Sequence, residues 1–105
     1  MSTAQERPRP VDGQLRLLPW TTPEGNPCYL STDSGHSRLS LLADDVEAAQ
    51  LDSGEQVLLG ARAVLADAGA GERAVRFALT RAVESLSEAL RIAVSRGRRI
   101  PGNDL

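Results

Sequence analysis

The chain has 105 residues and a formal net charge of −2, with 41% hydrophobic and 25% charged residues. This balance supports one globular domain and argues against global disorder. Aromatic residues make up only 3%, which is too few for the stacking platforms of single-strand nucleic-acid binders, and the acidic balance argues against general nucleic-acid or anionic-membrane binding. The single cysteine excludes an intramolecular disulfide and favours a reducing compartment, so we expect a cytoplasmic protein without a membrane span.

The N-terminal third divides into a tail and a predicted β-hairpin. Residues 1–13 are polar and proline-containing without periodicity, which is typical of a disordered tail. Residues 14–32 contain two short extended runs around a turn cluster at 21–26, where Gly25 supplies a permissive backbone position. An isolated two-stranded hairpin is marginal in water, so we expect this one to lie against the rest of the domain.

Residues 37–68 are predicted to form one long helix. Ser53 with Gln56 fits a capping box that would begin a new helix there. A glycine inside a helix, however, costs only about 1 kcal/mol, which packing can override at Gly54. The apolar residues that continue in helical phase through this segment are Leu39, Leu42, Val46, Ala49, Val57, Ala61, Val64 and Ala68. A single helix is therefore favoured, with a break near 52–54 as the alternative.

A second helix is predicted over 72–96. The preceding Gly69-Ala70-Gly71 separates the two helices, with Gly69 suited to a left-handed C-terminal position. The helix should stop at Gly97, which leaves a C-terminal tail over 98–105. The sequence therefore predicts one mainly α domain over 14–97, in which an N-terminal β-hairpin is followed by a long antiparallel helical hairpin.

The second helix is apolar around more than half of its circumference. A stripe of large aliphatic residues lies beside a stripe of small ones, whereas an ordinary surface helix hides a stripe only a little over 100° wide. This helix therefore needs two neighbours, and we predict a homodimeric four-helix bundle. The alternative is a monomer whose β-hairpin covers the second stripe. The predicted dimer interface comprises Leu79, Ala82, Val83, Leu86, Ala89, Leu90 and Ala93.

Three aromatic residues are candidates for contact with a partner protein. Trp20 and Tyr29 concentrate aromatic surface on the predicted hairpin, and Phe77 falls on the polar arc of the second helix. In the alternative interpretation the two hairpin rings fix the hairpin to the helices, and a singly exposed Phe77 needs no explanation. These features predict a non-enzymatic interaction or regulatory module.

Residue types that support catalysis or metal binding are sparse. Cys28 is the only cysteine and His36 the only histidine, and with Asp33 they lie in one short strand–helix junction. Catalytic partners normally come from separate elements, and this spacing matches no standard zinc site. We therefore expect no catalytic residue, no cofactor and no metal ion.

A basic cluster at the end of the second helix supports an alternative function. In a small DNA-associated regulator these side chains would contact DNA phosphates. The face of the final helix that would enter the DNA groove is, however, too apolar for this role. The cluster comprises Arg91, Arg96, Arg98 and Arg99. In a more local interpretation its last three members pair with carboxylates on a neighbouring or partner helix. Those carboxylates, expected to form a solvated face, are Asp44, Asp45 and Glu47.

The sequence contains several distinctive short strings. They are Pro19-Trp20, Pro27-Cys28-Tyr29-Leu30-Ser31-Thr32-Asp33, Arg38-Leu39, and Ala43-Asp44 before Val46-Glu47-Ala48. With these strings, roughly residues 15–97 resemble a group of small proteins from high-GC actinobacteria of the Streptomyces type. All 12 basic residues are arginine, which fits the codon bias of a GC-rich genome. The resemblance implies a cytoplasmic bacterial protein and assigns no catalytic residue.

Overall fold

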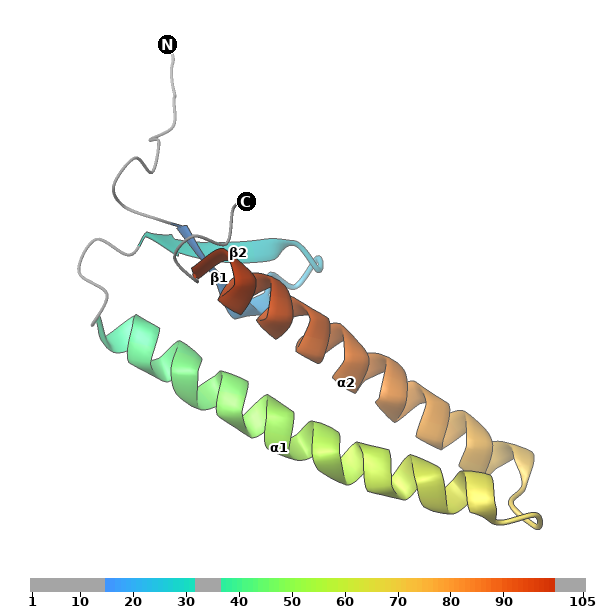
Figure 1. Cartoon of the computed structure of the whole chain (residues 1–105). Helices are drawn as coiled ribbons and strands as arrows, with labels where there is room; N and C mark the ends of the chain where they lie inside the picture. The colour runs from blue at the N-terminus through green and yellow to red at the C-terminus, as the bar shows by residue number, and fades with distance from the viewer. Residues whose placement is uncertain (1–14, 32–36, 100–105) are drawn as a thin grey trace.

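A β-hairpin precedes two long antiparallel helices in the computed structural model (Figure 1), which describes residues 15–31 and 37–99. The elements in chain order are β1 (Leu15–Thr21), β2 (Pro27–Ser31), α1 (Arg38–Ala66) and α2 (Glu72–Arg99). The predicted mainly α architecture with an N-terminal hairpin is therefore confirmed. The predicted N-terminal tail at 1–13 and the residues after Arg99 lie outside the described residues.

The turn between the strands follows from its residues. Gly25 has a φ of 90°, a left-handed conformation that glycine adopts without steric penalty. Its N–H donates to the Thr22 carbonyl oxygen at 2.8 Å, and the Thr22 N–H donates to the Asn26 carbonyl oxygen at 2.9 Å. The antiparallel register becomes irregular between Leu17 and Thr21, the stretch in which Pro19 lacks an N–H for the ladder.

Helix α1 runs without a break through Gly54, as the favoured prediction had it. Its N-cap is Ser37, whose Oγ accepts from the Ser40 N–H at 3.0 Å. The helix ends at Ala66, two residues before the predicted end at 68, because Asp67 caps it. The Asp67 N–H donates to the Val64 carbonyl oxygen at 3.1 Å.

Two predictions about glycine in the helical hairpin are wrong. Among the described residues only Gly25 has a positive φ, so Gly69 does not take the left-handed conformation. Its N–H instead donates to Asp67 Oδ1 at 2.9 Å. Helix α2 also continues through Gly97 to Arg99. A glycine ends a helix chiefly by adopting the left-handed conformation, and Gly97 does not.

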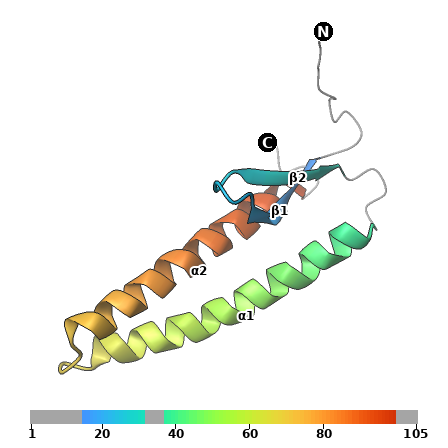
Figure 2. The same cartoon turned by 180° about the vertical axis from the view of Figure 1, so that it is seen from behind.

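The β-hairpin lies across one end of the helical hairpin, where α1 begins and α2 ends, in both views (Figures 1 and 2). Strand β1 packs mainly against α2 and less extensively against α1. All the buried apolar residues lie at this end, and they are Leu17, Leu18, Pro19, Ala43 and Ile92. The core of the described structure is therefore concentrated where three elements meet.

The first half of α1 does not bury the predicted apolar stripe. Leu39 is 40% exposed and Leu42 is 50% exposed, and Ala49 is also exposed. The buried residues of this helix are instead Ser40, Ala43 and Glu47. The prediction failed because polar contacts with β1, described below, set the rotation of α1 about its axis.

Replacing Ser37 with alanine is expected to destabilise the fold by about 1 kcal/mol, because the N–H of Ser40 loses its side-chain acceptor. Urea unfolding followed by circular dichroism at one protein concentration would measure the change. The matched variant Ser37→Asp keeps an acceptor and should stay near the wild-type value. Equal losses in both variants would contradict a capping role.

Candidate interaction surface

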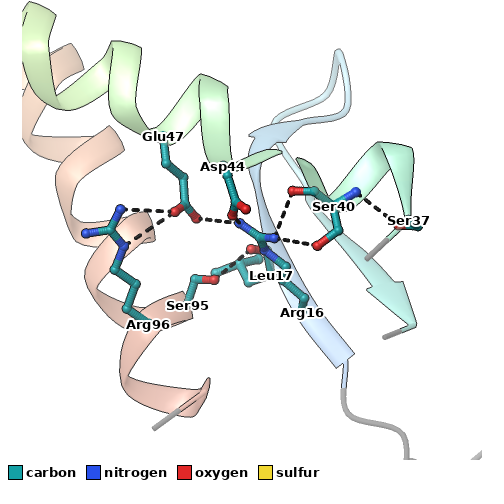
Figure 3. Close-up of polar contacts among 8 residues, drawn as sticks. All are labelled: Arg16, Leu17, Ser37, Ser40, Asp44, Glu47, Ser95 and Arg96. Atoms are coloured by element: carbon teal, nitrogen blue, oxygen red, sulfur yellow. Dashed lines mark hydrogen bonds and ion pairs between the residues drawn. The ribbon is translucent and has the colours of Figure 1, made fainter. Parts of the chain in front are cut away.

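A buried charge network fixes β1 to α1 (Figure 3). The Arg16 side chain is only 3% exposed, and its Nη2 lies 2.7 Å from Asp44 Oδ1 and 3.4 Å from Glu47 Oε2. Its Nη1 donates to Ser40 twice, at 3.0 Å to the carbonyl oxygen and at 2.8 Å to Oγ. The guanidinium is thus held by residues from two turns of one helix.

Helix α2 completes the same network through two residues. Glu47 Oε1 accepts from Arg96 Nη2 at 3.3 Å and from Arg96 Nε at 3.4 Å. The preceding residue is Ser95, whose Oγ donates to the Leu17 carbonyl oxygen at 2.9 Å. Because β1, α1 and α2 all contribute side chains or backbone atoms, the network connects the three elements. We therefore interpret its role as structural.

The carboxylates of α1 differ from the predicted solvated face at one position. Asp45 is exposed and the Asp44 side chain is 55% exposed, but Glu47 is 1% exposed. The prediction was wrong for Glu47 because Arg16 and Arg96 approach it from two other elements. The local pairing of Arg96 with a carboxylate of the neighbouring helix is confirmed.

Sequence reasoning did not identify Arg16. The sequence did contain a signal. Arg16 lies within the apolar run LRLLPW, and an arginine in such a run is unusual unless it pairs with a buried acceptor. The spacing of Ser40, Asp44 and Glu47 by three and four residues places three acceptors on one side of a helix. Together these patterns would have indicated a buried pair.

One face of the helical hairpin is apolar and uncovered by the described residues. On α2 it carries the aliphatic ridge, by which we mean Leu79, Val83, Leu86, Leu90 and Val94, each between 45% and 63% exposed. On α1 it carries three exposed leucines at seven-residue spacing, Leu51, Leu58 and Leu65. The β-hairpin contacts other residues of α2, notably Ser95. It therefore does not cover the aliphatic ridge.

A groove of about 350 Å³ lies beside the ridge, between α1 and α2. Its lining is dominated by small and aliphatic side chains. Those that matter here are Gly54, Leu58, Ala61, Ala82, Leu86 and Ala89. Of the predicted dimer interface, Ala82, Leu86 and Ala89 thus line the groove. Leu79, Val83, Leu90 and Ala93 are exposed outside it.

The structure does not bring the three aromatic candidates together. Trp20 on β1 is half-buried, and Tyr29 on β2 is 46% exposed. Phe77 is 67% exposed near the start of α2, at the other end of the helical hairpin. At about 100° per residue, Phe77 and Leu86 lie on opposite sides of α2. The aromatic residues therefore form no single contact surface.

The remaining candidates are dispersed. Arg96 is engaged by Glu47, Arg98 is exposed, Arg91 is half-buried and Arg99 is the last residue of α2. Cys28 is half-buried on β2. The other two members of the Cys28, Asp33 and His36 junction lie outside the described residues.

No three His, Cys, Asp or Glu side chains of residues 15–31 and 37–99 come together as a metal site would require. Neither of the two described helices has the length and apolar character of a membrane span. Protein-family models, curated proteins and solved structures yield no significant match to the chain.

Proposed function

We propose that this chain is a non-enzymatic interaction module that acts as a cytoplasmic homodimer. One observation carries the proposal, namely the exposure of the aliphatic ridge between 45% and 63%. Monomeric soluble proteins rarely expose contiguous apolar patches of more than a few hundred Å². The ridge and the three α1 leucines together place eight exposed large aliphatic side chains on one face of the helical hairpin, and apolar faces of this kind typically mark a site of association. A second copy of the chain is the simplest cover.

The buried polar groups support a structural module better than an enzyme. The buried ionisable side chains of the described structure, Arg16 and Glu47, bind each other and their partners Asp44 and Arg96 rather than line an open cleft. The groove has few polar lining groups with which to orient a substrate. The cytoplasmic location is supported by the single cysteine of the chain.

Light scattering is expected to give a wild-type mass of about twice 11.2 kDa. Replacing Leu90, which is 58% exposed on the ridge, with aspartate should convert the dimer to monomer, because the new carboxylate would be buried without a partner. The matched control is Phe77→Asp, at a more exposed residue on the opposite side of α2. It should leave the mass unchanged.

A wild-type mass of 11.2 kDa at every concentration would contradict the proposal. Dissociation of the dimer by Phe77→Asp but not by Leu90→Asp would place the interface on the side of α2 opposite the aliphatic ridge, which would also contradict the proposal. The alternative, a small DNA-associated regulator, draws on Arg91, Arg96, Arg98 and Arg99. No observation favours it, since Glu47 already engages Arg96.

A further inference from the structure

We propose that the dimer forms by reciprocal insertion, in which Leu86 and its ridge neighbours enter the groove of the partner while the partner's ridge enters this groove. This arrangement rests on the proposed homodimer and adds to it the site and geometry of association. Its occupant is a second copy of the chain. Three observations support it.

The first observation is that ridge and groove share one face. Leu86 belongs to the aliphatic ridge and also lines the groove, beside Ala82 and Ala89. An interface with two-fold symmetry uses the same surface on both copies, so that surface must contain both a projection and a recess that receives it. The ridge beside the groove meets this requirement within a single surface.

The second observation is the spacing of the ridge. Leu79, Val83, Leu86 and Leu90 are separated by four, three and four residues, the seam pattern that places knobs into holes of a facing helix. The recess they would meet includes small residues, among them Gly54, Ala61 and Ala82, between larger aliphatic ones such as Leu58. The small residues leave room at their positions for the large aliphatic residues of a facing copy.

The third observation is the extent of what must be covered. A single helix of another protein laid in the groove would leave the outer ridge residues, such as Val83 and Leu90, in water. An apolar small molecule in about 350 Å³ would leave even more of the face exposed. A second copy covers the groove and the ridge together, because each copy contributes both.

Substitution of Gly54, compared with substitution of Gly60, tests the proposed insertion of the partner's ridge into the groove. A Cβ built at Gly54 meets nothing within 4 Å, and the same is true at Gly60 of the same helix. Gly54 lines the groove, whereas Gly60 does not. A side chain can therefore begin at either position without a clash at its Cβ, and arginine has a higher helix propensity than glycine. Only arginine at Gly54 would occupy the recess with a long charged side chain.

Gly54→Arg is expected to weaken dimerisation by about tenfold or more, the loss typical of obstructing a central contact. Gly60→Arg should leave the dimer dissociation constant within about twofold of wild type. Sedimentation equilibrium would give both constants, and circular dichroism would verify that both variants retain helical content.

Failure of this inference and failure of the proposed function give different results. A dimeric wild type whose dissociation constant is unchanged by Gly54→Arg overturns reciprocal insertion but leaves the homodimer in place. A monomeric wild type overturns both. A monomer that enhances the fluorescence of an apolar dye, with the signal lost in Gly54→Arg and retained in Gly60→Arg, assigns the groove to an apolar ligand instead.

Discussion

Replacement of Glu47 by alanine is expected to destabilise the fold by about 3–5 kcal/mol, the cost typical of removing one partner from a buried ion pair. The Glu47 carboxylate has a 2% exposed side chain and contacts Arg16 and Arg96 at 3.4 Å and 3.3 Å. Without it, the buried Arg16 keeps only the half-exposed Asp44 as a charged partner. Urea unfolding at a fixed protein concentration would measure the loss.

Two variants separate the pairing from a general effect of removing charge. Asp45→Ala removes an exposed carboxylate from the same helix and should change stability by no more than about 0.5 kcal/mol. The double variant Arg16→Met with Glu47→Leu replaces the pair by apolar side chains. It should be more stable than Glu47→Ala, since no unpaired charge stays buried. Similar small losses for Glu47→Ala and Asp45→Ala would contradict a buried pair.

The order of elements could be predicted because it depends on local signals. Gly25 within a polar cluster fixes a turn, and apolar residues at three- and four-residue spacing fix two helices. The continuity of α1 through Gly54 was also correct, since one glycine costs less than the packing of a long helix provides. The ends were less accurate, as Gly97 shows, because residue identity alone does not determine which glycine adopts the left-handed conformation.

The burial of Arg16 and Glu47 could not be inferred from periodicity, because the two residues belong to different elements and meet only in the folded chain. Charged side chains are almost always solvated unless paired. The sequence method therefore assigned Glu47 to water. The same contact turns the first half of α1 so that Ser40 and Ala43 face inward while Leu39 and Leu42 face out.

The aliphatic ridge of α2 remains uncovered within the described chain. The width of the apolar surface on α2 predicted that one helical neighbour would be insufficient, and the structure leaves the ridge exposed within the described chain. The small residues that face α1, including Ala82 and Ala89, are covered more fully than Leu86 or Leu90. The large side chains of α2 thus remain exposed, where a second molecule can cover them. Association through these side chains stays a prediction.

Replacing Leu86 with alanine tests that association through stability. In an isolated chain Leu86 is 60% exposed, so truncation would change stability by about 0.5 kcal/mol at most and would improve helix propensity. In a dimer that buries Leu86 against the partner, the same truncation should cost about 2–5 kcal/mol per subunit. We expect the larger loss, together with a melting temperature that is lowered and rises with protein concentration, since folding and association are one equilibrium.

The matched control for this experiment is Leu59→Ala. Leu59 is also 60% exposed, it lies on α1 outside the groove lining, and its truncation removes the same atoms. Differential scanning calorimetry over a wide concentration range would compare the two variants directly. Equal and small shifts for Leu86→Ala and Leu59→Ala, with no dependence on concentration, would show that the ridge remains in water. A loss confined to Leu86→Ala would locate the association energy on the aliphatic ridge, because exposure in the single chain does not distinguish the two leucines.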